Sequence, residues 1–249
     1  MRNTGKNRDS FGLKRLGNAV LDLLYPRRCP VCGDIIMPKG GECCDRCRGA
    51  FAYVTEPYCL KCGKPLREET EALCPDCLRK ERFFDFGRAV YRYDDRIGRS
   101  IYGFKYNGRQ EYARFYAQEI VRRYGRMLSE LKPDALVPIP LHKKRLRKRG
   151  YNQAALIAQE VSRLTGIPAE PSLLQRVRNT RPQKSLNERE RENNLKKAFK
   201  IRQNDVSLET VILIDDIFTT GSTMDSAAGC LRDQGVKGVY FIVLSITSV

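Results

Sequence analysis

The chain has 249 residues and a formal net charge of +17. That length allows one sizeable α/β core with a small appendage, and the charge indicates anionic partners such as phosphates, nucleic acid or an acidic membrane surface. No apolar run reaches the roughly 18 residues that a membrane span needs, and the basic lead of the chain lacks the features of a secretory signal. We therefore expect a cytoplasmic protein whose ten cysteines remain thiols or bind metal.

Residues 1–25 form a polar, basic extension, and residues 26–80 carry a regular cysteine pattern. Pairs of the form Cys-x2-Cys recur every 15 positions, with 11 residues between one pair and the next. Each pair points two thiolates at one metal, and two pairs complete a tetrahedral four-thiolate site. The pattern therefore predicts a double zinc ribbon with two structural zinc ions. The expected metal ligands are Cys29, Cys32, Cys44, Cys47, Cys59, Cys62, Cys74 and Cys77.

The spacing leaves open which pairs share a metal. Pairing of neighbours closes a loop of 11 residues, whereas crossed pairing closes one of 26, residues 33–58. Loop entropy favours neighbours by only about 0.8 kcal/mol, which folding could override. We expect neighbours to share a zinc ion, with four thiolates leaving no open position for a water ligand.

Residues 81–249 predict an α/β domain behind this small zinc-ribbon domain. Apolar runs typical of buried strands alternate with amphipathic helical segments, which favours a parallel sheet flanked by helices. The expected strands are 89–93, 135–139, 198–201, 211–214 and 239–247, and the expected helical segments are 96–127, with a break near 106–108, 154–164 and 224–232.

A dense basic run, residues 143–149, follows the second of these strands and has six cations in seven positions. Like charges at this density repel one another on a helix face, so we expect a loop. The run by itself favours a solvated loop or a nucleic-acid patch. Its position after a core strand also suits a pyrophosphate group, whose charge must be neutralised as it departs.

The stretch 211–223 carries the most specific pattern in the chain. Four apolar residues predict a buried strand, Asp215 and Asp216 stand where it ends, and a hydroxyl-rich turn opens onto a helix. Free N–H groups at a helix start, beside hydroxyls, form a site for a phosphate monoester. The acids would repel that phosphate and instead suit a sugar diol or hydrated Mg²⁺, so the stretch predicts a ribose 5-phosphate site. The turn residues are Thr219, Thr220, Gly221, Ser222 and Thr223.

This pattern resembles the phosphoribosyl-pyrophosphate (PRPP) signature of type I phosphoribosyltransferases. The resemblance implies that Asp215 and Asp216 are the catalytic pair, which holds the ribose hydroxyls while PRPP binds with Mg²⁺, and that the turn holds the 5′-phosphate. It also implies a type I phosphoribosyltransferase fold, in which the long basic segment 176–197 is a flexible lid that excludes water. A ribose-phosphate turn in the same chain favours the pyrophosphate interpretation of the basic run.

Four motifs in order resemble the ComF family over about residues 25–247. They are the double zinc ribbon, the segment 137–142 with the Arg-Gly-Tyr-Asn-Gln that follows it, the spaced pattern between Arg176 and Phe199, and the acid pair with its turn. The resemblance implies a pyrophosphate-side motif and a lid motif. The pyrophosphate-side residues are Arg145, Arg149, Gly150, Asn152 and Gln153, and the lid residues are Gln183, Arg191 and Asn194.

The resemblance implies a PRPP-binding protein that handles single-stranded DNA during natural competence, together with a membrane uptake channel or a helicase. As an enzyme it would transfer the phosphoribosyl group to a nitrogen acceptor that the sequence does not identify. The alternative is a non-catalytic adaptor that binds single-stranded DNA and uses PRPP or a nucleotide as a regulatory ligand. Either protein would be cytoplasmic or peripheral at the inner face of the membrane. Aromatic residues among cations at 104–106 and 112–116 suit base stacking, although a helical core stripe fits them too.

Overall fold

The computed structural model describes residues 26–37, 41–177, 198–202 and 207–248. They form two compact units, one up to Ala50 and one from Phe51 onward. The basic extension and the predicted lid residues Gln183, Arg191 and Asn194 lie outside the described residues. The expected domain boundary at residue 80 stays a prediction. The cysteines form a first cluster (Cys29, Cys32, Cys44 and Cys47) in the smaller unit and a second cluster (Cys59, Cys62, Cys74 and Cys77) in the larger one.

The smaller unit is organised around the first cluster. Its apolar centre consists of Ile36 together with three buried cysteines, and the last of these lies on the short 3-10 helix η1 (Asp45–Cys47). Cys29 N donates to Asp34 O and Gly33 N donates to Cys29 O. These hydrogen bonds close the turn of the first knuckle, the name we use for a Cys-x2-Cys pair and the turn that holds it. Among the described residues of this unit, the cysteines of the cluster are also the apolar centre, so a metal bound by them would stabilise its fold.

The larger unit is an α/β structure. Its helices and strands in chain order are α2 (Pro75–Arg79), β1 (Gly87–Arg92), α3 (Asp95–Tyr106), α4 (Tyr112–Leu131), β2 (Ala135–Pro138), α5 (Lys143–Arg149), α6 (Gln153–Thr165), β3 (Leu174–Arg176), β4 (Phe199–Ile201), β5 (Thr210–Phe218), α8 (Ser222–Arg232) and β6 (Gly238–Ile246).

Four parallel strands form the main sheet in the order β1-β6-β5-β2. β5 lies in the interior, where Leu213 stands opposite Phe241 of β6 and Val137 of β2. Every residue from Val211 to Ile214 is fully buried, because helices cover both faces of the sheet. The predicted parallel sheet flanked by helices is confirmed.

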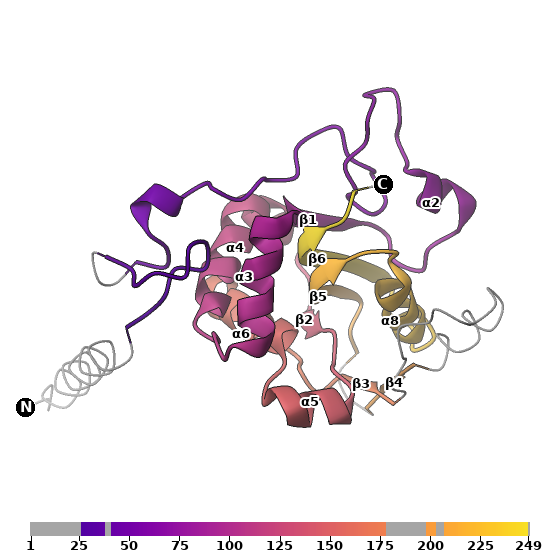
Figure 1. Cartoon of the computed structure of the whole chain (residues 1–249). Helices are drawn as coiled ribbons and strands as arrows, with labels where there is room; N and C mark the ends of the chain where they lie inside the picture. The colour runs from indigo at the N-terminus through magenta and orange to yellow at the C-terminus, as the bar shows by residue number, and fades with distance from the viewer. Residues whose placement is uncertain (1–25, 38–40, 178–197, 203–206, 249) are drawn as a thin grey trace, which may run out of the picture. The chain divides into compact units, whose positions relative to one another are not determined.

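Helices α3, α4 and α6 lie on one side of the sheet and α8 lies on the other (Figure 1). α8 also packs against β4, which pairs with β3 in a separate antiparallel ladder. The expected strand at 198–201 is present as β4, whereas β3 was not expected, because three residues with one buried side chain carry no periodic signal. In the described part of the chain, no helix combines the length and the apolarity needed to cross a bilayer.

The basic run is a helix, so the expectation of a loop was wrong. At the start of α5 the His142 side chain accepts a hydrogen bond from Lys144 N, and at its end Gly150 takes a left-handed conformation with φ +84°. The cationic side chains of α5 are exposed or half-buried. Water therefore screens their repulsion, and a short, capped helix tolerates it.

The second cluster is joined to β1 by backbone hydrogen bonds. Val54 N donates to Val90 O, and Gly87 N donates to Lys61 O at 2.8 Å. The loops that carry the cluster therefore lie along the edge of the sheet. The hydrophobic core between α8 and the sheet also contains Cys59, Cys62 and Cys74.

Candidate functional site

Two carboxylates stand among the last four residues of β5 and point in different directions, because the strand runs past its predicted end at residue 214 to Phe218. Asp216 is buried, and its Oδ1 lies 2.7 Å from Nζ of Lys105 at the end of α3. Asp215 is half-buried, and its Oδ1 accepts a hydrogen bond from Asp216 N at 2.9 Å. Successive residues of a strand point to opposite faces, which explains the divergence. The acid pair thus stands at the carboxyl end of an interior strand, where open α/β sheets bind ligands.

The pKa of Asp215 is raised to about 7. Burial contributes most to the rise, and the neighbouring Asp216 carboxylate adds to it. Lys105 and Arg176 act in the opposite direction, because nearby cations favour the ionised form. Near neutral pH Asp215 can therefore gain or lose a proton, and a bound cation would favour its ionised form.

Lys105 was not among the expected site residues. Its partner Asp216 lies 111 positions away in the chain, and no local pattern distinguishes Lys105 from the other cations of α3. The two side chains are only 19% and 12% exposed, so their charge-assisted hydrogen bond is sheltered from water. The contact holds the Asp216 carboxylate in one orientation.

The hydroxyl-rich turn connects β5 to α8. Gly221 has φ +79°, and a Cβ there would lie 2.5 Å from Phe218 Cζ, so both the backbone and the packing require glycine. Thr220 Oγ1 lies 3.2 Å from Ser222 Oγ and accepts from Ser222 N at 3.5 Å, at the first residue of α8. The turn therefore places hydroxyls beside the N–H groups at the start of a helix. Exposed or half-buried side chains belong to Thr219, Thr220, Ser222 and Thr223.

The predicted pyrophosphate-side residues lie between β2 and the start of α6. Asn152 accepts a hydrogen bond from Ala154 N as the N-cap of α6, and its Nδ2 donates to Ile139 O at 3.0 Å. Gln153 is buried, and its Nε2 finds no hydrogen-bond partner among the described residues. Both amides therefore shape the loop that follows β2, and Gly150 terminates α5 just before them.

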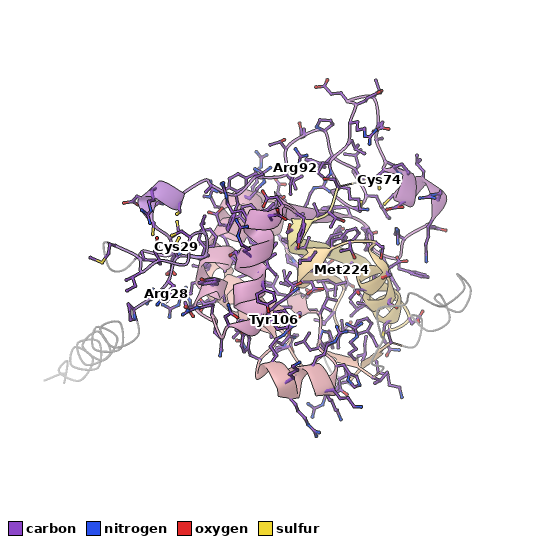
Figure 2. All side chains as sticks on the ribbon, viewed as in Figure 1. Arg28, Cys29, Cys74, Arg92, Tyr106 and Met224 are labelled. Atoms are coloured by element: carbon purple, nitrogen blue, oxygen red, sulfur yellow. The ribbon has the colours of Figure 1, made fainter. Side chains whose placement is uncertain are left out.

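The cations of α5 reach two other elements. The Arg149 guanidinium lies 4.9 Å from the ring centroid of Tyr106, which stands at the end of α3 above α5 in Figure 2. Burial lowers the pKa of Arg176 on β3, the nearby Arg145 lowers it further, and Asp215 opposes both. Arg176 thus lies within electrostatic reach of both the basic helix and the acid pair. The sequence predicts that Arg176 begins the lid segment and predicts no site role for it.

The aromatic side chains of α3 and α4 fall into two groups. One group is buried and forms part of the core, which was the alternative to base stacking. Its members are Phe104, Tyr112, Phe115 and Tyr116. Tyr102 and Tyr106, one helical turn apart on α3, are each 59% exposed, and their ring centroids lie 4.8 Å apart. A surface aromatic pair therefore stands on the same helix as Lys105.

Each cysteine cluster places its four sulfur atoms within 4.8 Å of one another. Tetrahedral zinc with Zn–S bonds of about 2.3 Å separates its sulfurs by roughly 3.8 Å. Cys32 and Cys44 are 3.9 Å apart at sulfur, and Cys62 and Cys74 are 3.6 Å apart. Figure 2 marks the two groups at Cys29 and Cys74. Both clusters fit structural zinc, and neighbouring pairs share each site, as loop entropy predicted.

Comparison with known proteins matches residues 20–78 to the double zinc ribbon domain family. Among solved structures, the adenine phosphoribosyltransferase of Leishmania tarentolae is similar at 19% identity and a TM-score of 0.30, over 55% of this chain and 71% of that chain. A TM-score this low supports no conclusion about this chain.

Three relatives match most of the chain. Competence protein F of Haemophilus influenzae is 33% identical over 85% of this chain and 93% of its own length. Competence protein ComFC of Bacillus subtilis is 31% identical over 77% of this chain and 78% of its own. DNA utilization protein YhgH of Salmonella typhimurium is 32% identical over 87% of this chain and 96% of its own. The chain therefore belongs to the ComF family, as its motifs predicted.

Proposed function

We propose that this protein binds PRPP with Mg²⁺ at the carboxyl end of β5 and acts as a phosphoribosyltransferase during DNA uptake. The observation that carries the proposal is the conjunction of a carboxylate pair and a hydroxyl-rich helix start at the end of one interior strand. Relatives named for competence and for DNA utilization support the DNA-uptake context. The protein would then work in the cytoplasm or at the inner face of the membrane, beside an uptake channel or a helicase.

Each part of the site has its own role in this proposal. The turn binds the 5′-phosphate through N–H groups and hydroxyls, and Asp215 and Asp216 accept hydrogen bonds from the ribose hydroxyls. Bound Mg²⁺ supplies positive charge that stabilises the departing pyrophosphate. Arg176 adds positive charge within electrostatic reach of Asp215, and Arg145 adds more beside Arg176. Lys105 orients Asp216 through its ion pair.

Calorimetric titration of PRPP into the protein, with and without Mg²⁺, tests the proposal. Wild type should bind in the presence of Mg²⁺, and Asp215→Ala/Asp216→Ala should lose about 100-fold or more in affinity, because two charged acceptors are removed. Asp233→Ala is the matched control, since it removes an exposed carboxylate from the far end of α8. A folded, zinc-loaded wild type that does not bind PRPP would reject the proposal.

Turnover requires a second assay. Pyrophosphate release would be measured with nitrogen nucleophiles and with single-stranded DNA ends as acceptors. The double variant should lose the release that wild type shows, because the same carboxylates hold the sugar during transfer. Tight PRPP binding without release for any acceptor would instead favour an adaptor that uses PRPP as a regulatory ligand.

A second candidate function, binding of single-stranded nucleic acid, is favoured by the surface aromatic pair on α3. Tyr102 and Tyr106 are each 59% exposed, which suits stacking with bases, and Arg149 lies over the Tyr106 ring. The exposed cations of α5 would contact the phosphate backbone. Because Lys105 on α3 contacts Asp216, a strand bound here would lie near the acid pair.

Fluorescence anisotropy with a labelled single-stranded oligonucleotide tests this surface. Tyr102→Ala/Tyr106→Ala should weaken binding by about ten-fold or more, since stacking on an aromatic side chain contributes roughly 1–3 kcal/mol per base. Tyr93→Ala removes another exposed tyrosine of the larger unit and should leave the affinity near that of wild type. Equal binding by both variants would exclude the aromatic pair as the nucleic-acid surface.

A further inference from the structure

Residues 80–85, which we call the brace, connect the end of α2 to the start of β1. The Arg82 side chain is only 7% exposed, its Nη2 donates to Thr220 O at 3.2 Å, and its Nη1 lies 3.7 Å from Asp225 Oδ2. Lys80 Nζ lies 3.8 Å from the same carboxylate oxygen. One buried guanidinium thus joins the hydroxyl-rich turn, residues 219–223, to the first turn of α8; because the proposed function places the 5′-phosphate there, we call residues 219–223 the phosphate turn.

The brace also holds the middle and the end of α8. Phe83 N donates to Asp225 Oδ1 at 2.8 Å, and a Cβ placed on Gly229 would lie 3.3 Å from the Phe83 ring. Arg232 Nε donates to Phe83 O at 3.1 Å, and its Nη2 donates to Asp85 Oδ2 at 2.7 Å. Three successive parts of α8 are therefore tied to residues 80–85.

The brace begins three residues after the last thiolate of the second cluster, Cys77. Cys74 is the N-cap of α2, and Cys77 lies within that helix. Asp76 between them forms a 2.8 Å ion pair with the buried Lys64, which follows the other knuckle of the cluster. Zinc held by all four thiolates would fix α2 and with it the point from which the brace starts.

We propose that zinc at the second cluster, and not zinc at the first, sets the conformation of the phosphate turn through the brace, with Arg82 and Asp225 as positioning residues. A carboxylate as buried as Asp225 needs its partners, because an uncompensated buried charge destabilises its surroundings. Loss of the Arg82 contacts therefore frees the Thr220 carbonyl and the first turn of α8 together. The identity of the ligand rests on the proposed function, whereas the coupling between cluster and turn does not.

Hydrogen exchange of the full-length, zinc-loaded protein tests the brace without any ligand. In Arg82→Gln the amides of residues 219–228 should exchange about ten-fold faster than in wild type, because a charged donor to the turn is lost. Arg79→Gln is the matched control, since Arg79 is exposed and its ion pair is with Asp76. Arg82→Lys should recover part of the protection by restoring the charge beside Asp225. Equal exchange in Arg82→Gln and Arg79→Gln overturns the brace.

The zinc dependence is tested with Cys29→Ser/Cys32→Ser, in which zinc remains only at the second cluster, as metal analysis would verify. Removal of that zinc by a chelator should speed exchange at residues 219–228 more than in α4 and α6, which lie on the other face of the sheet. Removal of zinc from the first cluster alone should leave exchange at 219–228 as in wild type. No change on chelation, or an equal rise in all helices, overturns the zinc dependence.

Affinity for PRPP separates this inference from the proposed function. Wild type that binds PRPP, with Arg82→Gln weaker by about ten-fold, supports both. If wild type binds PRPP, but no more tightly than Arg82→Gln does, the proposed role of the brace is wrong and the proposed function stands. Wild type that does not bind PRPP overturns the proposed function, and the exchange measurements still decide the brace.

Discussion

The two cysteine clusters have the same ligand spacing and very different surroundings. Three cysteines of the first cluster form, with Ile36, the apolar centre of the smaller unit, and Cys32 is exposed. The second cluster contributes three buried cysteines to the core that also contains one face of β5 and β6. One cluster therefore organises a small unit around itself, whereas the other is part of an α/β core and lies next to the segment that holds the hydroxyl-rich turn.

A matched pair of glycines shows the same difference. Gly33 and Gly63 each follow the second cysteine of a knuckle, with φ of +79° and +77°. A Cβ on Gly33 would meet nothing within 4 Å, whereas a Cβ on Gly63 would lie 2.8 Å from Gly87 O at the start of β1. The knuckle demands the same backbone in both places. Local sequence thus sets the metal site, and the packing around it sets what the metal stabilises.

Removal of one thiolate from each cluster should give the largest difference. Cys74→Ser should lower the free energy of unfolding of the larger unit by about 4 kcal/mol, because it removes a zinc ligand from the shared core. Cys29→Ser should change that free energy by less than about 0.5 kcal/mol, since Cys29 belongs to the other unit. Calorimetry with parallel zinc analysis measures both, and equal destabilisation would contradict the contrast between the clusters.

Alanine at the two glycines should give the next largest difference. Both substitutions place a side chain at positive φ, which costs roughly 1–2 kcal/mol. Gly63→Ala adds a clash with the β1 backbone, so it should cost a further 1–3 kcal/mol or so in the larger unit. Urea unfolding followed by circular dichroism measures the two costs. If Gly33→Ala is as damaging to the larger unit as Gly63→Ala, the second knuckle is not packed as described.

The order of zinc release should follow burial. A chromogenic chelator should remove zinc in two phases, with the phase from the first cluster at least about ten-fold faster, because exchange from a buried site requires local opening of the core. Cys29→Ser should lack the fast phase, and its slow phase should match that of wild type. A fast phase that persists in Cys29→Ser would assign rapid release to the second cluster instead.

The smallest effect should be a pH dependence that belongs to the larger unit. Asp215 binds its proton more tightly in the folded chain, with a pKa of about 7, than in the unfolded chain, where an aspartate has a pKa of about 3.9. Its ionisation therefore makes the folded state less stable as pH rises from about 4 to about 7.

Asp215→Asn removes this titration and keeps an oxygen that can accept from Asp216 N. Its melting temperature should rise relative to that of wild type as pH increases across the window from about 4 to about 7. Asp233→Asn, at an exposed position, should follow wild type. A constant difference between Asp215→Asn and wild type at all pH values would show that Asp215 does not titrate in this range.

The sequence alone determined the parts of this protein whose chemistry depends on near neighbours in the chain. A four-residue apolar run predicted β5, since a parallel strand covered on both faces needs apolar residues throughout. The acid pair follows this apolar run within the same strand, and the hydroxyl-rich turn and the helix come after it, so their order could be predicted. The Cys-x2-Cys spacing predicted two metal sites, because each knuckle needs only two cysteines and the turn between them.

Only the tertiary structure decided what supports these local parts. Lys105 reaches Asp216 across 111 positions, and Arg82 reaches Thr220 across 138. The basic run formed a helix because its side chains face solvent, and exposure is a property of the whole fold. Packing likewise buried Phe104 and left Tyr106 at the surface. Contacts at such separations leave no periodic or spaced signal in a single sequence. The acid pair could therefore be found from the sequence, whereas Lys105, which contacts the acid pair, and Arg82, which contacts the turn, could not.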